Sequence, residues 1–182
     1  MSFISEKRAL VKLQGIKNSL AETIRMGYEH RAKSCSTCDT PGACCLDAHF
    51  VNVRITRLEA AAIIERLNQF SEQHQRAVFA RITDAIENYK LTEDTLQTFA
   101  CPLFEKGTGC LVHEYGKPLP CIAHACYERK QDLPPDDLLT EREIEVDGLN
   151  RRVYGSTTLL PLPLGIRSLT PSSDARPVSS SE

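Results

Sequence analysis

The chain has 182 residues, with 24 Asp and Glu against 22 Lys and Arg, so its formal net charge is −2. This length suits one domain with a single modest core. The balanced charge argues against nucleic-acid binding, which usually needs a basic excess. No apolar stretch reaches the roughly 18 residues of a membrane helix. The N-terminus becomes charged at once and lacks the apolar region of a secretory signal, so we expect a cytoplasmic protein.

Apolar residues recur at three- and four-residue intervals over 5–33, which predicts a long amphipathic helix. Thr56 and Glu59 form a capping-box pattern that should open a second helix over 57–69. Ser71 is the expected cap of a third helix over 71–90. These three helices are the predicted scaffold of a small, mainly α-helical domain.

The remaining elements are shorter. Alternating apolar and polar residues over 49–55 predict a short strand or extended segment. A short helix is expected over 92–99, and a further helix over 137–154, capped by Asp136 or Asp137 and weakened at Gly148.

The segment from Gly155 is rich in Pro and Ser and contains no aromatic residue. We therefore predict a domain over 1–154 and an extended or disordered tail over 155–182 that adds nothing to the core and binds a protein partner.

Cysteine is unusually frequent for a cytoplasmic protein, with eight in the chain. In a reducing compartment, clustered cysteines are far more often metal ligands or redox groups than structural disulfides. They form two groups within loops predicted over 34–49 and 101–127, spaced C-x2-C-x5-C-C and C-x8-C-x10-C-x4-C. All eight are predicted metal ligands, with a thiol redox switch as the lesser alternative: Cys35, Cys38, Cys44, Cys45, Cys101, Cys110, Cys121 and Cys126.

The two groups and the motifs around them, CSTCDTPGACC, CPLF, CLVHEY and GKPLPC, resemble the bacterial cysteine-cluster proteins of the YkgJ type. The resemblance covers about residues 35–126 and implies a zinc- or iron-chelating protein. Flagellin lysine methylases carry a similar cysteine cluster. Two departures stand out: five residues separate Cys38 from Cys44 where the family usually has two, and Lys117 and Ile122 occupy positions where it favours arginine.

Thiolate ligands suit both zinc and iron. Long Gly- and Pro-rich loops and the adjacent pair Cys44–Cys45 favour a polynuclear iron–sulfur cluster, of the 4Fe–4S type, over zinc. His113 and His124 lie among the late cysteines and are interpreted as neighbours of the metal site rather than ligands.

The predicted function is therefore an electron-transfer or maturation accessory to a partner enzyme. The alternative is a zinc-stabilised adaptor without a redox role. A methyltransferase-like activity is suggested only by the resemblance, because the sequence contains no cofactor-binding fingerprint, and no catalytic residue can be named. We expect protein partners, and neither nucleic acid nor membrane.

Overall fold

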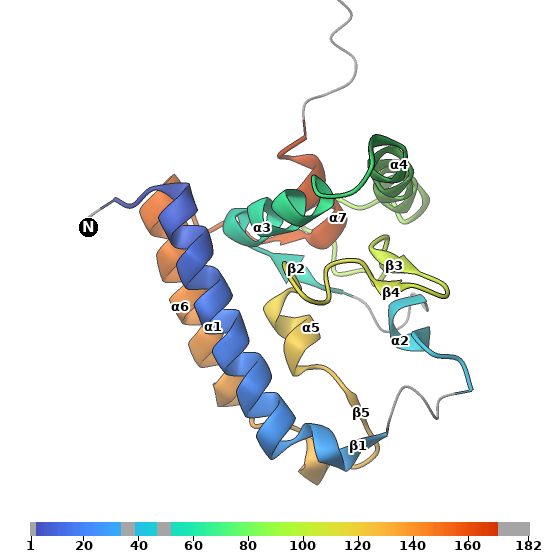
Figure 1. Ribbon diagram of the computed structural model, residues 1–182, viewed down its shortest axis with the longest axis vertical. Coiled ribbons are helices and arrows are strands. Elements are labelled where there is room, and N and C mark those ends of the chain that lie inside the picture. The colour runs from blue at the N-terminus through green and yellow to red at the C-terminus, as the bar shows by residue number, and fades with distance from the viewer. Residues whose placement is uncertain (1–2, 34–38, 47–51, 171–182) are drawn as a thin grey trace, which may run out of the picture.

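The computed structural model describes residues 3–33, 39–46 and 52–170. It confirms the mainly helical fold (Figure 1). The long helices are α1 (Glu6–Gly27), α3 (Arg57–Leu67), α4 (Glu72–Asn88) and α6 (Asp136–Tyr154), and the short ones are α2 (Ala43–Leu46), α5 (Leu119–Ala123) and α7 (Leu162–Arg167). Single 3-10 turns cover η1 (Glu29–Arg31) and η3 (Lys130–Asp132).

Strand content in the described residues is limited to three antiparallel two-residue pairs. They are β1 (Ala32–Lys33) with β5 (Cys126–Tyr127), β2 (Arg54–Ile55) with β6 (Leu160–Pro161), and β3 (Phe104–Glu105) with β4 (Gly109–Cys110). The strand predicted over 49–55 is confirmed at its last two residues, while 49–51 lie outside the described part of the chain.

Helices α1 and α6 run antiparallel along one side of the domain (Figure 1). The backbone N–H of Ile4 donates to the carbonyl of Arg152 at 3.3 Å, which places the start of α1 beside the end of α6. One apolar cluster fills the space between these helices, α3 and α5: Ala9, Leu13, Leu20, Ile24, Leu58, Ala62, Leu119, Val146 and Leu149. The helix predicted over 5–33 ends earlier, at Gly27, because glycine weakens the helix and the chain then tightens into η1.

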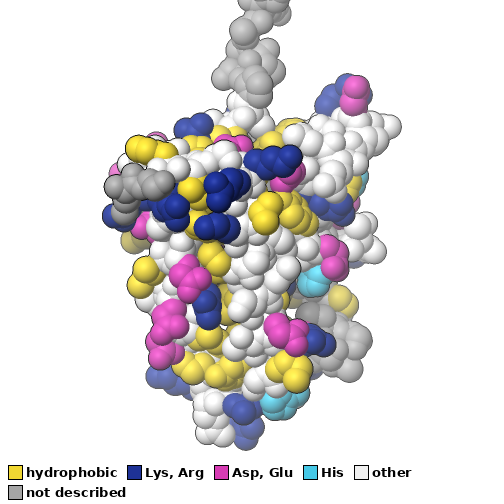
Figure 2. All heavy atoms as spheres, turned by 60° about the vertical axis from the view of Figure 1, so that its left-hand side comes forward, with side chains coloured by type: hydrophobic (Ala, Val, Ile, Leu, Met, Phe, Trp, Pro, Cys, Tyr) yellow, Lys and Arg dark blue, Asp and Glu magenta, His cyan; other side chains and the backbone are white. Residues whose placement is uncertain are grey.

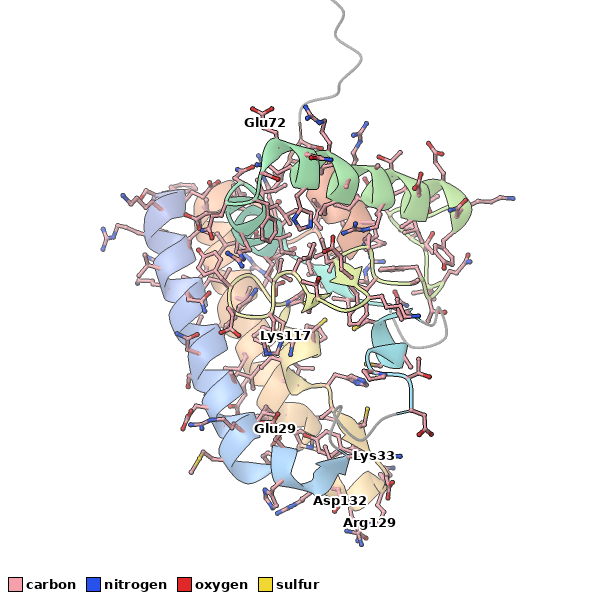
Figure 3. The ribbon with its side chains drawn as sticks, turned by 45° about the vertical axis from the view of Figure 1, so that its right-hand side comes forward. Glu29, Lys33, Glu72, Lys117, Arg129 and Asp132 are labelled. Atoms are coloured by element: carbon pink, nitrogen blue, oxygen red, sulfur yellow. The ribbon has the colours of Figure 1, made fainter. Side chains whose placement is uncertain are left out.

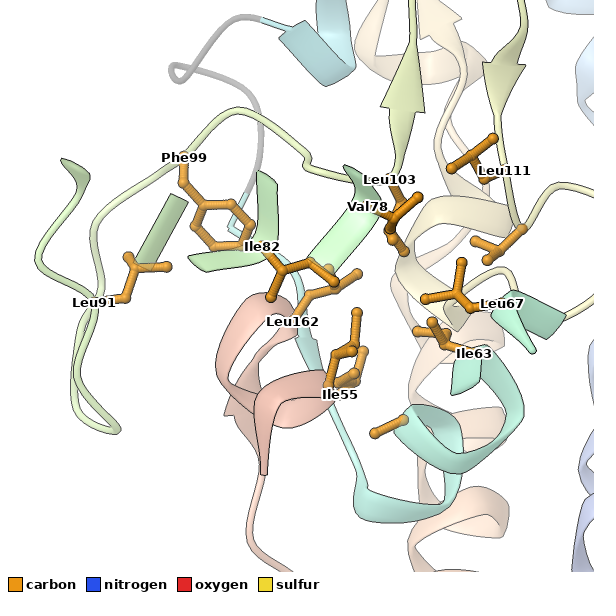
Figure 4. Close-up of a cluster of buried hydrophobic side chains, with 13 residues drawn as sticks. Ile55, Ile63, Leu67, Val78, Ile82, Leu91, Phe99, Leu103, Leu111 and Leu162 are labelled. Carbon is orange, nitrogen blue, oxygen red and sulfur yellow. The ribbon is translucent and has the colours of Figure 1, made fainter. Parts of the chain in front are cut away.

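A second apolar cluster lies among α3, α4, α7 and the loops that carry the late cysteines (Figure 4). Phe99 is its largest fully buried side chain. Its other labelled members are Ile55, Ile63, Leu67, Val78, Ile82, Leu91, Leu103, Leu111 and Leu162. The loop before the late cysteines is therefore anchored in the core at both Phe99 and Leu103.

The predicted caps of α3 and α4 are confirmed. Thr56 Oγ1 accepts the backbone N–H of Glu59 at 3.2 Å, and Glu59 Oε2 accepts that of Thr56 at 3.1 Å, so the capping box is complete. Ser71 accepts the N–H of His74. The predicted cap of α6 is wrong: Pro135 occupies the cap position and makes no side-chain hydrogen bond.

The helix predicted over 92–99 is absent from the structure, where this segment is a turn followed by extended chain. Its backbone groups are bonded elsewhere. The Arg54 guanidinium donates to the carbonyls of Glu93 and Thr95, and the Thr92 N–H donates to Thr95 Oγ1 at 2.8 Å. These side-chain bonds replace the carbonyl acceptors and the N–H donor that a helix would use.

The prediction for the C-terminal segment is wrong as far as Thr170. Residues 155–170 belong to the domain, because β6 pairs with β2 and α7 packs into the second apolar cluster, where Leu162 and Ile166 are buried. The prolines do not prevent this helix: Pro161 is its N-terminal cap and Pro163 lies in its first turn, where a missing N–H costs nothing. Residues 171–182 lie outside the described part.

The exposed face over α1 and α6 mixes charges (Figure 2). Lys and Arg side chains gather near the start of α1, and Asp and Glu side chains follow further along the helix pair. No helix in the described part of the chain is both long and apolar enough to cross a membrane.

The buried position of α7 leads to a stability prediction. Leu162→Ala should lower the free energy of unfolding by about 2–5 kcal/mol, because it leaves a cavity in the core. Leu159→Ala, three residues earlier and 46% exposed, should cost less than about 1 kcal/mol. Urea unfolding measures both. Equal small losses would contradict the role of α7 in the core.

Candidate metal centre

Six of the eight predicted ligands lie in the described residues, and none of the six forms a disulfide there. The structure places them on short elements and loops: Cys44 and Cys45 in α2, Cys101 just before β3, Cys110 in β4, Cys121 in α5 and Cys126 in β5. Cys35 and Cys38 lie outside the described part of the chain, as does His49.

The described part of the first cysteine group meets the second group where α2 approaches the late loop. The backbone N–H of Cys101 donates to the carbonyl of Cys45 at 2.7 Å. Next to this bond, the ring of Phe104 occupies the space where a side chain at position 42 would stand, since a Cβ on Gly42 would lie 2.0 Å from Phe104 Cζ. Residues more than fifty positions apart therefore form one local structure.

Four thiols influence one another across this junction. Burial raises the pKa of Cys45, Cys101 and Cys121 to about 12 and also raises the pKa of Cys110. Repulsion from a neighbouring thiolate adds to burial for every pair among the four: Cys45 with Cys101 and Cys110, Cys101 with Cys110 and Cys121, and Cys121 with Cys110 and Cys45. One early and three late cysteines thus form a single electrostatic cluster, which we call the four-thiol cluster.

Backbone N–H groups near two of these sulfurs favour their thiolate forms. Those of Leu103 and Phe104 lower the pKa of Cys101, and that of Val112 lowers the pKa of Cys110, each against the effect of burial. The Phe104 N–H also donates to the Cys101 carbonyl oxygen at 3.3 Å. The donors lie two or three residues after each cysteine. Hydrogen bonds to sulfur stabilise its thiolate form and tune a bound metal, so the loops after Cys101 and Cys110 suit a metal-ligating role.

The described side chains do not form a preassembled ligand set. Within residues 3–33, 39–46 and 52–170, no group of three or more His, Cys, Asp or Glu side chains is arranged so that it could hold a metal ion. The four-thiol cluster is therefore a set of neighbours whose sulfurs still have to converge. Its donor chemistry nevertheless fits zinc or an iron–sulfur cluster, because both are held by four thiolates, and nearby N–H groups tune such a site.

Cys44 and Cys126 lie at the edge of this arrangement. The side chain of Cys44 hydrogen-bonds to that of Cys45. Cys126 pairs with Lys33 in the β1–β5 ladder, so it lies opposite the residue two positions before Cys35.

Two lysines supply positive charge close to the sulfurs. Lys117, just before α5, lowers the pKa of Cys110 and Cys121, although burial outweighs it in both. Burial lowers the pKa of Lys17 on α1, and attraction to Glu59 and Cys121 opposes that shift. A centre with four thiolates is negatively charged, so these ammonium groups would offset part of its charge.

Glu59 joins the site to the helices, a role that its capping motif alone did not indicate. Its Oε1 lies 3.5 Å from Lys17 Nζ and accepts the backbone N–H of Leu119, at the start of α5, at 3.2 Å. The side chains of Lys17 and Glu59 are 3% and 5% exposed. The signal in the sequence was Lys17 itself, a charged residue spaced with Leu13 and Leu20 on the apolar face of the first helix.

Both histidines are exposed. The backbone N–H of His113 donates to the carbonyl of Cys110 at 3.1 Å. His124 follows α5, where burial and then Lys117 lower the pKa of its imidazole. Both line a cavity beside the late loop. Their interpretation as non-ligands stays a prediction.

Comparison of the chain with protein-family models, with curated proteins and with solved structures finds no match. The resemblance to YkgJ-type proteins therefore remains a prediction from motifs. The function is therefore argued from the packing, charge and hydrogen bonding of the described cysteine loops.

The close contact at Gly42 allows a test of the junction between the cysteine groups. Gly42→Ala should destabilise the protein by about 1–3 kcal/mol, because φ is +81° and the new methyl group would collide with the Phe104 ring. Gly107→Ala has a similar φ of +87° but open space, so it should cost only about 1 kcal/mol. Thermal and urea unfolding would compare the variants, and equal losses would remove the special role of the Phe104 contact.

The buried ion pair gives a second test. Lys17→Met should lower the free energy of unfolding by about 3 kcal/mol, because it leaves the Glu59 carboxylate buried without a cation. Adding Glu59→Gln should recover part of this loss, so the two substitutions should be non-additive in urea unfolding. Lys12→Met, at an exposed position of the same helix, is the control and should change stability little. Additive effects would show that the pair is not coupled.

Proposed function

We propose that the chain is a metal-binding protein in which Cys45, Cys101, Cys110 and Cys121 hold one iron–sulfur cluster. The observation that carries the proposal is the backbone contact between Cys45 and Cys101, which brings the early and late cysteines together. The effects that these four thiols have on one another's pKa agree with that placement. They come from three separate parts of the chain, and the shared Cys45–Cys101 backbone bond holds two of those parts together.

The chain's own groups have defined roles around such a centre. The N–H groups of Leu103, Phe104 and Val112 would stabilise thiolate charge, and Lys117 would offset part of the negative charge of the whole centre. Partial burial of the cysteines would limit the access of water, which also affects redox potential. A bound iron–sulfur cluster would supply one-electron transfer.

The remaining cysteines form a second proposed set. Cys126 pairs with Lys33, close in the sequence to the first cysteine group. Cys35, Cys38, Cys44 and Cys126 would then hold a second metal or support the loops around the first one.

A cytoplasmic electron-transfer or maturation accessory to a partner enzyme is the role that we propose for such a centre. The partner cannot be assigned to an arm beginning at Gly155, because that segment is core as far as Thr170. The second candidate is a zinc-stabilised adaptor, since tetrahedral zinc takes the same four thiolates.

Metal analysis of protein purified without oxygen distinguishes the two functions. Iron and sulfide in stoichiometric amounts, with a broad brown absorption in the visible range that bleaches on reduction, would support the iron–sulfur cluster. A colourless protein with one zinc and no iron would support the adaptor instead.

The ligand assignment is tested with paired variants. Cys101→Ser should remove most of the metal of the four-thiol centre and lower the melting temperature, because that metal joins the early and late loops. Cys126→Ser should keep this metal. Full metal content in Cys101→Ser, or its loss only in Cys126→Ser, would contradict the assignment.

A further inference from the structure

A cavity of about 400 Å³ lies between α1, the loop after Cys110 and the end of α5. Residues of α1 form one wall, including Gln14, Lys17 and Asn18, and Lys117 and His124 come from the other side. This volume is within the range of small-molecule sites, about 300–1,000 Å³. Lys117 lines the cavity and also acts electrostatically on Cys110 and Cys121 of the four-thiol cluster.

The cations of this cavity have unused hydrogen-bonding capacity. Lys117 is partly buried and has no ion-pair or hydrogen-bond partner within the described residues. The buried ammonium of Lys17 contacts Glu59 at 3.5 Å but makes no full hydrogen bond to any described group. An ammonium carries three N–H donors, and leaving such donors buried without acceptors is unfavourable.

The acidic residues of the cavity do not neutralise Lys117. Glu29 and Glu114 are both exposed. Figure 3 shows Lys117 between the late loop and α5. Glu29 lies apart from it, near the C-terminal end of α1. Arg25, a further cation of the lining, is already paired with Glu22 at 2.7 Å.

A second cavity of the described residues has the opposite character. It measures about 560 Å³ and is lined by Glu59, Glu143 and Asp147. Its cation, Arg54, already donates to the carbonyls of Glu93, Thr95 and Leu159. An anion would meet carboxylates and a fully engaged guanidinium there, so the cavity beside the four-thiol cluster is the better anion site.

We infer that the cavity between α1 and α5 binds a small molecule through an anionic group, a phosphate or a carboxylate, that contacts the ammonium group of Lys117. The buried charge of Lys17, in the cavity wall, would add attraction without direct contact. The anionic group would give Lys117 an acceptor that no described side chain supplies. The amide nitrogen of Asn18 is also free to donate, because Asn18 uses its oxygen to accept from Gln14 at 2.7 Å. The inference goes beyond the proposed metal centre and does not require that centre to be filled.

The test uses the full chain labelled with nitrogen-15 and titrated separately with inorganic phosphate and with acetate. Saturable shifts should appear in the amide signals of residues 113–117 and 122–125 with at least one of the two anions. Lys117→Met should weaken that binding at least tenfold, because a charge-assisted contact is lost. Lys12→Met changes the net charge equally on an exposed part of α1 and should leave the binding constant unchanged.

Three results would overturn the inference: no saturable shift at these residues with either anion, equal binding by Lys117→Met, or an equal loss in Lys12→Met, which would indicate diffuse charge attraction. Metal content is measured on the same samples. If a sample without metal binds the anion through Lys117, the inference about the cavity is supported and the proposed metal centre is contradicted. If a sample contains the metal but binds no anion, the metal centre is supported and the inference is overturned.

Discussion

The arrangement depends on one buried carboxylate. Glu59 closes the capping box of α3 through Thr56, pairs with Lys17 of α1 and accepts the first N–H of α5 at Leu119. Three helices that are far apart in the sequence therefore meet at one side chain. A buried charge is costly unless it is paired and hydrogen-bonded, and this carboxylate has both kinds of partner.

This constraint positions the functional region as well as the fold. Helix α5 begins at Leu119, bonded to Glu59, and carries Cys121 two residues later. The same anchor holds Lys17 on the wall of the cavity beside α5. The late loop is fixed from its other end by Phe99 and Leu103 in the core. The late cysteines are thus held between two anchors, the buried pair Phe99 and Leu103 on one side and the Glu59–Leu119 hydrogen bond on the other.

Sequence periodicity predicted α1, α3, α4 and α6 because their buried faces repeat at the helical period. Periodicity could not predict the segments whose structure depends on contacts with residues far away in the sequence. Residues 92–99 contain local helix signals, but Arg54 takes the carbonyls that a helix would need. The prolines after Gly155 predict a tail. In the structure, however, Leu162 and Ile166 are buried in a core that forms only once α3 and α4 have folded.

The cysteine groups show the same division. Spacing and composition predicted that the cysteines of both groups are metal ligands, and the Cys45–Cys101 bond brings part of the two groups together. Which cysteines neighbour one another could not be read from spacing, because it depends on the Phe104–Gly42 contact and on where Glu59 holds α5. The pairing of Cys126 with Lys33 depends on a two-residue ladder that has no sequence signal of its own.

The charge balance of the site links the proposed centre to the proposed ligand cavity. Burial raises the pKa of all four thiols, and repulsion between thiolates adds to this for Cys45, Cys101 and Cys121, so a bound cation would favour their thiolate forms. Lys117 lines the cavity and acts electrostatically on Cys110 and Cys121, so its single charge can act on either site. An anion in the cavity would draw on the same ammonium that offsets the thiolates. Occupation of one site should therefore be felt at the other through Lys117, without any movement of the helices that Glu59 holds together.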